Sequence, residues 1–562
     1  MPGMISIEVL EFGRMSDKII SKLDIDSQNF KENRDKFNDL ILKYKSKENT
    51  IKLGGGSVNI EKQHGKGRMT ARERIDYLAD DNSTFFEIGL YAAYDMYVDV
   101  GNINSAGVVT GVCKINNYDC MIIANDATVK AGAYFEITLK KTLRAQRIAL
   151  ENNLPIIYLV DSAGVFLPMQ DKVFPDEDHF GKIFYNNARL SALGLTQIAC
   201  VMGPCVAGGA YLPVMCDKYV IVEGASMFLA GPALVKAAIG QDIDQNTLGG
   251  ASTHTSISGT ADYFAKDDVD ALNRIQSILK HINFENKKAF LKKDYSEPLY
   301  NVDELPGIFN VDRITQYDML EVICRIVDGS QFDEYKASYG KTIICGTCTI
   351  GGYNVGIVAN QKLVQKSNVG EMQMGGVIYS DSADKAARFV MNCNQDKIPI
   401  LFIHDVNGFM VGKDAEWGGI AKDGAKLVNA VANSVVPKIT LVIGGSYGAG
   451  NYAMSGRSYK PRFLFTWPSS TIAVMGGEQA AKTMTDIKIS KMGKLDDNQI
   501  EKIYNDLKNI YDNQSRPEYA AARLWVDAII NPLETRDKIM RALDIINNQD
   551  KMPVPRFGVL QV

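Results

Sequence analysis

The chain has 562 residues, of which 46% are hydrophobic and 23% charged, and its formal net charge is −4. This balance is typical of an ordinary globular protein and excludes the strongly basic surface that a nucleic-acid partner requires. The length exceeds what one compact core contains, so we expect several domains.

The apolar runs and the cysteines point to a reducing compartment inside the cell. No apolar run reaches the roughly 20 residues of a membrane-spanning helix, so we expect no membrane insertion. The opening MPGMISIEVLEFGRMSDKII lacks a signal or transit pattern, which predicts a cytoplasmic protein, with the mitochondrial matrix as the alternative in a eukaryote. The nine cysteines are an odd number, and Cys345 and Cys348 lie in a strand-like CxxC without a second ligand pair. We therefore predict neither disulfides nor a metal site.

The first part of the chain, up to about residue 90, reads as a series of charged helices. The segments NFKENRDKFNDLILKYKSKEN and MTARERIDYLAD are helical in pattern, and Thr70 is placed to cap the second of them. We expect this N-terminal helical arm to lie over a core formed by the rest of the chain.

The remaining chain repeats one order of elements. The first half contains DCMIIANDATVKAG, a helical FEITLKKTLRAQRIALENN, the buried strand LPIIYLVDSAG and TQIACVMGPCVAGGAY. The second half contains YNVGIVANQKLV, a helical SADKAARFVMNCNQ, the strand IPILFIHDVNG and PKITLVIGGSYGAGNY. Aligning them pairs Asn125 with Asn360, Asp161 with Asp405 and Ala207 with Ala449, at offsets of 235, 244 and 242 residues.

This duplication predicts two homologous α/β domains in tandem. A repeat of this length is far longer than a solenoid unit, and continuous apolar strands alternating with helices indicate mainly parallel sheets covered by helices. The polar stretch 280–306 loses the strand pattern, so we place the boundary there, with domains at residues 1–295 and 296–562.

The segment GGSYGAGNYAM, residues 444–454, contains G-x-S-x-G and raises the question of a serine nucleophile. In an α/β-hydrolase an acid and then a histidine follow the serine, but all five histidines of this chain precede Ser446. The alternative is that the backbone is the functional part. A glycine-rich turn between a buried strand and a helix presents free amide N–H groups, which form an oxyanion hole without side chains. The equivalent turn MGPCVAGGAY in the first half predicts a second such hole.

Beyond these patterns, the chain resembles the carboxyltransferase (beta) subunits of biotin-dependent acyl-CoA carboxylases, and within them the methylcrotonyl branch. The resemblance covers nearly the whole chain and is most specific in ANDATVKAGAYF, VFPDEDHFG, GPCVAGGAYLPVM, GIAKDGAKLVNAV and GAGNYAMSGRSYKP. It implies two crotonase-like domains. The stretch KSNVGEMQMGGVIYSDSAD departs from the family pattern and leaves the acyl group open.

The resemblance also implies roles for the two turns. Ala207, Gly208 and Gly209 would stabilise the thioester oxyanion of the acyl-CoA. Gly448, Ala449 and Gly450, with Phe409 nearby, would bind the urea oxygen of carboxybiotin. No acid-base pair is needed, because the ureido anion left after loss of CO2 can take the proton from the substrate. Tyr452 falls where the propionyl branch selects acyl length.

The chain has no AMKM-type biotinylation segment and no ATP-binding glycine loop. The resemblance therefore implies a partner (alpha) chain that carries biotin and consumes ATP, and a homo-hexameric core with shared active sites. The residues Lys66, Arg68, Arg72 and Lys141 are candidates for the CoA phosphates, or equally a solvated basic face. His179 and His254 read as loop-holding residues and His404 as a core residue.

Three functions remain in competition on the sequence. The first is carboxyl transfer from N-carboxybiotin to an acyl-CoA, above all 3-methylcrotonyl-CoA giving 3-methylglutaconyl-CoA, with propionyl-CoA as an alternative. The second is the carboxyltransferase subunit of a biotin-dependent acyl-CoA decarboxylase. The third is a hydratase or isomerase of the crotonase type without biotin, for which Glu223 and Glu478 are the available acids.

Overall fold

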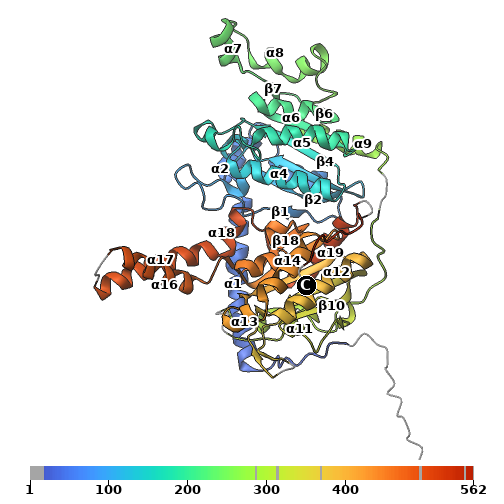
Figure 1. Ribbon diagram of the computed structural model, residues 1–562. Coiled ribbons are helices and arrows are strands. Elements are labelled where there is room, and N and C mark those ends of the chain that lie inside the picture. The colour runs from blue at the N-terminus through green and yellow to red at the C-terminus, as the bar shows by residue number, and fades with distance from the viewer. Residues whose placement is uncertain are drawn as a thin grey trace, which may run out of the picture.

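Two eight-stranded sheets form the framework of the computed structural model (Figure 1). The structure describes residues 18–284, 288–311, 315–367, 370–492, 496–549 and 552–560. Parts of three segments discussed above lie outside the described residues: 1–17 at the chain start, 285–287 in the expected linker and 368–369 in the divergent stretch.

The two sheets have the same topology. The first runs in the order β1-β2-β3-β4-β5-β6-β8, with β7 beside β5, and the second in the order β9-β10-β11-β15-β17-β18-β20, with β19 beside β17. In each sheet the first three strands pair antiparallel and the others parallel. The predicted duplication into two mainly parallel α/β units is therefore confirmed.

The strands are bounded as follows. In the first sheet they are β1 Phe86–Ile88, β2 Val108–Ile115, β3 Tyr118–Asn125, β4 Ile156–Ser162, β5 Gln197–Val206, β6 Lys218–Val222, β7 Ser226–Phe228 and β8 Tyr263–Ala265. In the second sheet they are β9 Asp333–Glu334, β10 Ile343–Ile350, β11 Tyr353–Asn360, β15 Ile400–Val406, β17 Lys438–Tyr447, β18 Phe463–Thr466, β19 Thr471–Ala473 and β20 Ala528–Ile529. Two short ladders, β12 (Gln365–Lys366) with β13 (Met372–Gln373) and β14 (Val377–Ile378) with β16 (Gly408–Phe409), lie beside the second sheet.

Equivalent helices begin with the same kind of cap in both halves. In α4 (Glu136–Glu151) the backbone N–H of Phe135 donates to Thr138 Oγ1 at 3.0 Å, and in α12 (Ser380–Asp396) that of Tyr379 donates to Ser382 Oγ at 2.9 Å. Each hydroxyl satisfies an amide that the helix leaves free. Other helices of the two units include α5 Phe180–Ala192, α9 Asp268–Lys280, α14 Ile420–Ala432 and α19 Thr535–Ile546.

The N-terminal arm consists of α1 (Gln28–Lys52), α2 (Ser57–His64) and α3 (Ala71–Leu78). Thr70 caps α3 in a reciprocal capping box with Glu73, as the sequence predicts. The aromatic ring of Phe37, on α1, lies 6.1 Å from that of Phe309 and 6.4 Å from that of Trp467. The arm therefore packs on the second half as well as on the first.

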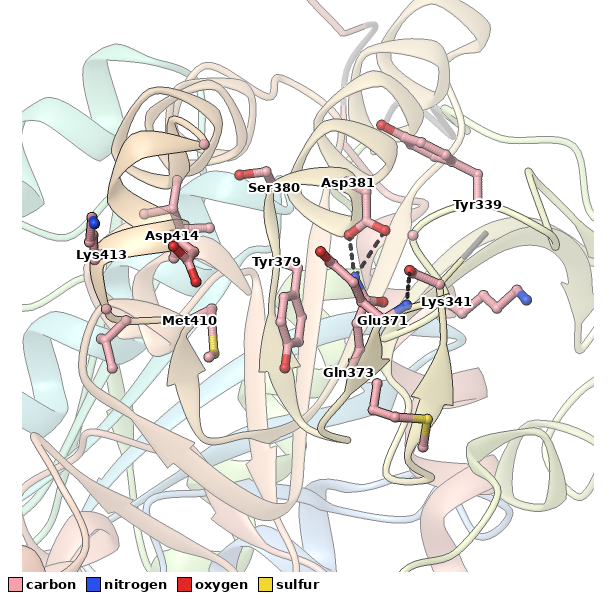
Figure 2. A pocket seen from close by; sticks show the side chains of 18 of the residues that line it. Tyr339, Lys341, Glu371, Gln373, Tyr379, Ser380, Asp381, Met410, Lys413 and Asp414 are labelled. Carbon is pink, nitrogen blue, oxygen red and sulfur yellow. Dashed lines mark hydrogen bonds between the residues drawn. The ribbon is translucent and has the colours of Figure 1, made fainter. Parts of the chain in front are cut away.

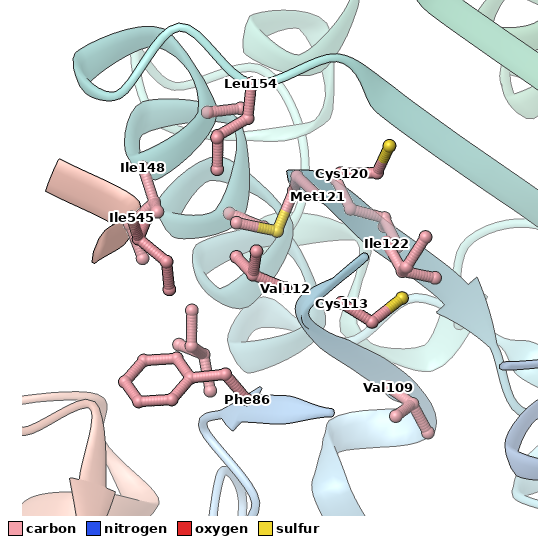
Figure 3. Close-up of a cluster of buried hydrophobic side chains, with 14 of the residues drawn as sticks. Phe86, Val109, Val112, Cys113, Cys120, Met121, Ile122, Ile148, Leu154 and Ile545 are labelled. Atoms are coloured by element: carbon pink, nitrogen blue, oxygen red, sulfur yellow. The ribbon is translucent and has the colours of Figure 1, made fainter. Parts of the chain in front are cut away.

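The two halves share one hydrophobic core. At one edge of the first sheet the ring of Phe86 packs edge-on against Phe463 and Phe465 of β18, at 5.4 and 5.9 Å. Figure 3 shows Phe86 in a cluster with side chains of β2, β3 and α4, which Ile545 of α19 joins from the second half. Because nonpolar surface from both halves is buried here, the halves stabilise each other.

A buried ion cluster also joins the halves. The carboxylate of Asp527 accepts hydrogen bonds from Arg144 of the first half, at 2.8 Å to each oxygen, and from Arg457 of the second half at 3.0 Å. Arg144 and Asp527 are almost completely buried, and the two guanidinium groups hold the pKa of Asp527 well below its usual range despite that burial. Buried charges of this kind are stable only when paired.

Candidate functional site

The first glycine-rich turn follows β5. Strand β5 ends at Val206, and the 3-10 turn Ala207–Ala210 and the short helix α6 (Tyr211–Val214) follow directly. Ala207 has φ of +56°, a left-handed conformation that a non-glycine residue adopts at a cost of about 1–3 kcal/mol. Ala207 and Gly208 are exposed, and a Cβ added at Gly209 would meet no atom within 4 Å. The turn thus presents bare backbone to open space.

The second turn follows β17 in the same way. Strand β17 ends at Tyr447 and α15 (Gly448–Ala453) begins at once, with Gly448 at φ of +51°. Ala449 is exposed, whereas Gly450 is buried, and a Cβ on Gly450 would lie 2.6 Å from Cγ2 of Val406. Glycine at 450 is therefore required by packing against β15, which is a different reason from the close approach of a ligand.

The structure corrects the alignment of the two turns by one residue. The left-handed residue after the strand is Ala207 in the first half and Gly448 in the second, so the offset is 241 residues and Ala207 pairs with Gly448, not with Ala449. Gly203 and Gly444 agree with this offset, because a Cβ on either would collide with the carboxylate of Asp161 or of Asp405. The pairs of Asn125 with Asn360 and of Asp161 with Asp405 are confirmed by the matching strands.

A buried aspartate lies behind each turn. In the first half, Asp161 Oδ2 accepts from Arg74 at 3.2 Å and from Gln63 at 3.3 Å, both from the arm. In the second half, Asp405 accepts from Tyr317 at 2.9 Å, from Lys362 at 2.8 Å and from the amide of Gly445 at 2.9 Å. Each carboxylate is fully engaged in holding the strand that leads into the turn, and it lies beneath the backbone, where a substrate cannot reach it.

Ser446 is not placed to act as a nucleophile. Its side chain is completely buried, and His404, also completely buried, places Nδ1 3.0 Å from Ser446 Oγ. His404 Nε2 faces the carbonyl oxygen of Met454, which can only accept, so Nδ1 is the accepting nitrogen and Ser446 donates to it. Asn451 Nδ2 in turn donates to Ser446 Oγ at 2.8 Å. Burial lowers the pKa of His404 to about 4, so this relay is neutral and holds the turn to its sheet.

His179 and His254, interpreted above as loop-holding residues, both hydrogen-bond to backbone groups. His179 Nδ1 accepts the amide N–H of Asp176 at 3.2 Å, and His254 Nε2 lies 2.7 Å from the carbonyl oxygen of Met227. No cluster of three or more metal-ligating side chains occurs in the described part of the chain. Nor does any helix among those residues have the length and apolar character needed to cross a membrane.

The four predicted basic residues do not gather at one surface. Lys141 is completely buried, donates to the carbonyl and hydroxyl oxygens of Ser105 at 3.0 and 2.8 Å, and has its pKa lowered by burial to about 7. Arg72 is held in a two-pronged ion pair by Glu87, at 2.8 and 3.0 Å. A phosphate at the surface cannot contact Lys141 in this arrangement, and it must compete with Glu87 for Arg72.

Of the remaining two, Arg68 donates to the carbonyl oxygen of Gly224 at 2.8 Å. Lys66 lines a surface cavity of about 620 Å³ beside the Gly54–Gly56 turn, together with Lys62 and Lys130. Three cations around one cavity suit an anionic ligand. The sequence did not indicate Lys62 and Lys130 as partners, because Lys62 lies on α2 and Lys130 in a 3-10 turn far along the chain.

An aromatic wall beside the first turn is a further feature that the sequence did not reveal. The ring of Phe180 lies 3.4 Å from the position of a Cβ on Gly208, and it is 5.0 Å from the ring of Tyr134 and 5.1 Å from that of Phe184. Phe184 in turn contacts Tyr211, whose exposure of 50% resembles the 48% of the equivalent Tyr452. Tyr452 stacks on Tyr459 at 6.0 Å, and Phe409 packs against Gly424 of α14.

In each half of the chain, a parallel strand is followed by a residue in the left-handed conformation and then by exposed backbone. Parallel α/β sheets bind ligands at the carboxyl ends of their strands, and amides at a helix start stabilise a developing negative charge on oxygen. The amides that open the two short helices have no acceptor within those helices, because the first turn of a helix leaves its N–H groups unpaired. The fold, with each of these turns at the carboxyl end of its strand, is that of the crotonase-like enzymes.

Comparison with known proteins gives the family. Residues 62–560 match the carboxyl transferase domain, and the chain belongs to that family. It is 45% identical to the mitochondrial methylcrotonoyl-CoA carboxylase beta chain of Dictyostelium discoideum, over 96% of this chain and 90% of the relative. It is 46% identical to the biotin-dependent 3-methylcrotonyl-coenzyme A carboxylase beta1 subunit of Mycobacterium tuberculosis, over 87% of this chain and 91% of that relative. The crystal structure of the beta subunit of geranyl-CoA carboxylase from P. aeruginosa superposes with a TM-score of 0.86 at 34% identity, covering 97% of this chain and 99% of that one.

Proposed function

We propose that the protein is the carboxyltransferase subunit of a biotin-dependent acyl-CoA carboxylase and that its acceptor is 3-methylcrotonyl-CoA, which becomes 3-methylglutaconyl-CoA. The observation that carries this proposal is the pair of equivalent strand-to-helix turns with exposed amides, one in each half of the chain. A reaction between two carbonyl-type substrates requires two such sites, and membership of the carboxyl transferase family supports the same chemistry.

We assign the roles of the turns from the resemblance to the carboxyltransferase family, and the backbone geometry of both turns suits those roles. The amides of Ala207, Gly208 and Gly209 receive the thioester oxygen, whose charge grows when the γ-carbon of the acyl chain loses a proton. Those of Gly448, Ala449 and Gly450 receive the urea oxygen of carboxybiotin. Carboxybiotin supplies the carboxyl group and a base, so the chain's own part is to align the substrates and stabilise charge. The exposed backbone of Ala449 and the left-handed Gly448 leave room for a ring carbonyl to approach.

The aromatic wall supports a short acyl group. Phe180 is nearly buried and stands against Gly208, with Tyr134 and Phe184 on either side. We take these rings as one side of the acyl pocket, where a short branched chain such as methylcrotonyl fits and a longer chain is hindered. Tyr452 lines the opening of the second turn, and the CoA phosphates are assigned to the basic cavity that Lys66 lines.

Two segments with exposed apolar side chains support assembly with other copies. Helix α7 (Pro232–Ile239) has no buried residue, although its sequence is PALVKAAI and Leu234 and Ile239 are 59% and 73% exposed. The α16–α17 hairpin (Gly477–Met492 and Asp497–Ser515) begins at the equivalent place, after β19, and projects from the body of the molecule, with Val474 at its base 78% exposed (Figure 1). Unpartnered apolar surface of this kind marks an interface. We assign it to a homo-hexameric core in which the first unit of one subunit faces the second unit of another.

The remaining parts of the proposal concern the partner chain and the compartment. An alpha subunit with biotin carboxylase and biotin-carrier parts supplies the carboxyl group, and ATP is consumed there. The location is the cytoplasm, or the mitochondrial matrix in a eukaryote, where the substrate of leucine breakdown is formed. The two units are taken as residues 1–295 and 296–562, although α1 packs on both of them.

The test is carboxyl transfer from free carboxybiotin to a set of acyl-CoA substrates. We expect the highest kcat/KM with 3-methylcrotonyl-CoA, lower values with propionyl-CoA and acetyl-CoA, and little transfer to geranyl-CoA. A preference for geranyl-CoA or propionyl-CoA would overturn the assignment of the acyl group. Absence of transfer to every acyl-CoA by a folded protein would overturn the carboxyltransferase itself.

A further inference from the structure

A cavity of about 580 Å³ lies in the second half, apart from the glycine turn (Figure 2). It is lined by the start of α12, by β13 with the adjacent Glu371, by residues 338–341 and by the loop and short helix of residues 410–420. None of the described residues that line it belongs to the turn Gly448–Asn451. Its volume is within the range of about 300–1,000 Å³ that small-molecule sites occupy.

The duplication shows which part of the first half corresponds to this cavity. The backbone pair of Ile378 with Phe409 has its counterpart, at an offset of 244 residues, in the bridge between Tyr134 and Val165. The next amide repeats the match, because Met410 N–H donates to the carbonyl of Ile378 at 2.8 Å and that of Phe166 donates to Tyr134 at 2.9 Å. Tyr379 and Met410 of the cavity wall therefore correspond to Phe135 and Phe166.

In the first half the corresponding space is filled by apolar side chains. The rings of Phe135 and Phe166 stack at 4.6 Å, and Tyr97 lies 5.1 Å from Phe135. Met96, Val100, Ile103 and other residues of the long connection between β1 and β2 complete this cluster. In the second half the connection between β9 and β10 comprises only residues 335–342, so the filling segment has no counterpart and the cavity remains.

Among the described residues, the cavity wall contains a buried hydrogen-bond acceptor that has no donor. Gln373 lines the cavity and is only 5% exposed, and its Nε2 donates to the two carboxylate oxygens of Asp381 at 3.2 and 3.4 Å. Figure 2 shows this contact. The other end of the same amide, Oε1, has no partner among the described residues. An unmet buried acceptor costs about 1–3 kcal/mol, which a bound donor would recover.

The surrounding charges favour a cationic donor over an anion. The start of α12 is already occupied by a carboxylate, because Ser382 N–H donates to Asp381 Oδ1 at 2.7 Å. The two lysines of the wall are turned to other partners: Lys341 donates to the carbonyl of Lys366 at 3.2 Å, and Lys413 lies 4.1 Å above the ring of Trp417. The carboxylates of Asp381, Glu371 and Asp414 remain around the cavity.

The pKa of Tyr339, another residue of the cavity wall, is affected by carboxylates at the start of α12. Burial, followed by the carboxylates of Asp384 and Asp381, raises its pKa above the usual value. Met410, Val411 and Ile420 are apolar residues of the wall, and Figure 2 shows Met410 on the side away from Gln373 and Asp381. An acceptor-rich end and an apolar side suit a ligand with a cationic head and an aliphatic stem.

We propose that this cavity binds an aliphatic primary ammonium group, which donates to Gln373 Oε1 and to Asp381 while its methylene stem lies against Met410 and Ile420. The group belongs either to a small free amine or to a lysine side chain of another protein. The chemistry of recognition is the same for both, and the first half of the chain cannot take such a ligand because its equivalent space is filled.

Isothermal titration of the full-length protein with 1,5-diaminopentane tests this proposal. We expect saturable binding at one site per chain, weakened at least tenfold by Gln373→Met and by Asp381→Asn. Ala415→Trp, which fills the cavity and removes no polar group, is expected to abolish binding. Glu416→Gln is the matched control, since Glu416 is an exposed acid of the same short helix that does not line the cavity.

Thermal melting of each variant distinguishes loss of binding from loss of folding. If Gln373→Met does not fold, Ala415→Trp tests the cavity independently, because it changes a different residue of the wall. A parallel titration with Nα-acetyl-lysine methylamide distinguishes a protein lysine from a free amine as the source. The proposal is overturned by absence of saturable amine binding, by binding that all three cavity variants leave unchanged, or by tighter binding of butyrate or inorganic phosphate than of the amine.

Discussion

Gly209→Ala separates the catalytic use of the first turn from its folding. A Cβ at this position meets no atom within 4 Å, and Gly209 does not have a positive φ, so the new methyl group causes no clash and no backbone strain. Replacing glycine by alanine in a helical conformation stabilises by up to about 1 kcal/mol. The melting temperature of the variant is therefore expected to equal or exceed that of the original protein.

The same methyl group lies in the space through which the thioester oxygen must approach. A thioester oxygen that accepts a hydrogen bond from the turn lies about 2.7–3.2 Å from the donating amide nitrogen. The new Cβ lies about 1.5 Å from the Cα of residue 209, and it displaces the thioester oxygen from that position. Loss of one donor of an oxyanion hole costs about 2.7–4 kcal/mol, or about 10²–10³ in rate. We expect kcat/KM for the acyl-CoA to fall by about that factor.

The measurement is the initial rate of carboxyl transfer from free carboxybiotin, together with thermal melting of the same samples. Gly181→Ala is the matched control, because Gly181 is also helical, has no atom within 4 Å of an added Cβ and has no positive φ. A Gly209→Ala variant that melts normally and keeps its activity within threefold would refute the assignment of the first turn.

Three further predictions concern the two turns and the buried ion cluster that joins the halves. Ser446→Ala is expected to keep most of the transfer activity, since the hydroxyl only supports the turn, and loss of all activity from a folded variant would instead indicate a serine nucleophile. Phe180→Ala is expected to raise the ratio of kcat/KM for geranyl-CoA to that for 3-methylcrotonyl-CoA at least tenfold, and an unchanged ratio would exclude Phe180 from the acyl pocket. Asp527→Asn removes the counter-charge of the buried Arg144 and of the partly buried Arg457, and it is expected to cost about 3–5 kcal/mol in the free energy of unfolding, measured with denaturant. Because the folded pKa of Asp527 is depressed, its contribution to stability is present above about pH 4 and is lost as the pH falls, and a stability difference between the two proteins that persists undiminished at pH 2 would contradict this.

The fold was predictable because the duplication repeats the pattern of buried strands and helices over long segments. Strands such as IIYLV and ILFI are apolar throughout, which is typical of a parallel sheet covered on both faces. The positions of both glycine turns followed from the same repeat. The exact alignment of the turns did not, because Ala207 adopts a left-handed conformation for which glycine is the usual residue, so the alanine was matched to the wrong neighbour.

The side-chain surroundings of the site could not be read from the sequence for a different reason. Whether a lysine faces a phosphate or the interior depends on which loop covers it, and Lys141 is covered by the turn that contains Ser105. Likewise, Gln373 and Asp381 are ordinary polar residues until the absence of a filling segment leaves a cavity beside them. These features depend on contacts between distant segments, which periodicity and spacing do not encode.

The most direct test of the account is an experimental structure of the assembled enzyme with 3-methylcrotonyl-CoA and biotin bound. The account predicts that the thioester oxygen lies about 2.7–3.1 Å from amide nitrogens of residues 207–209, and the urea oxygen at the same distance from those of residues 448–450 of the facing unit. A structure in which either oxygen is bound by side chains, or in which the two turns do not face a common space, would contradict it.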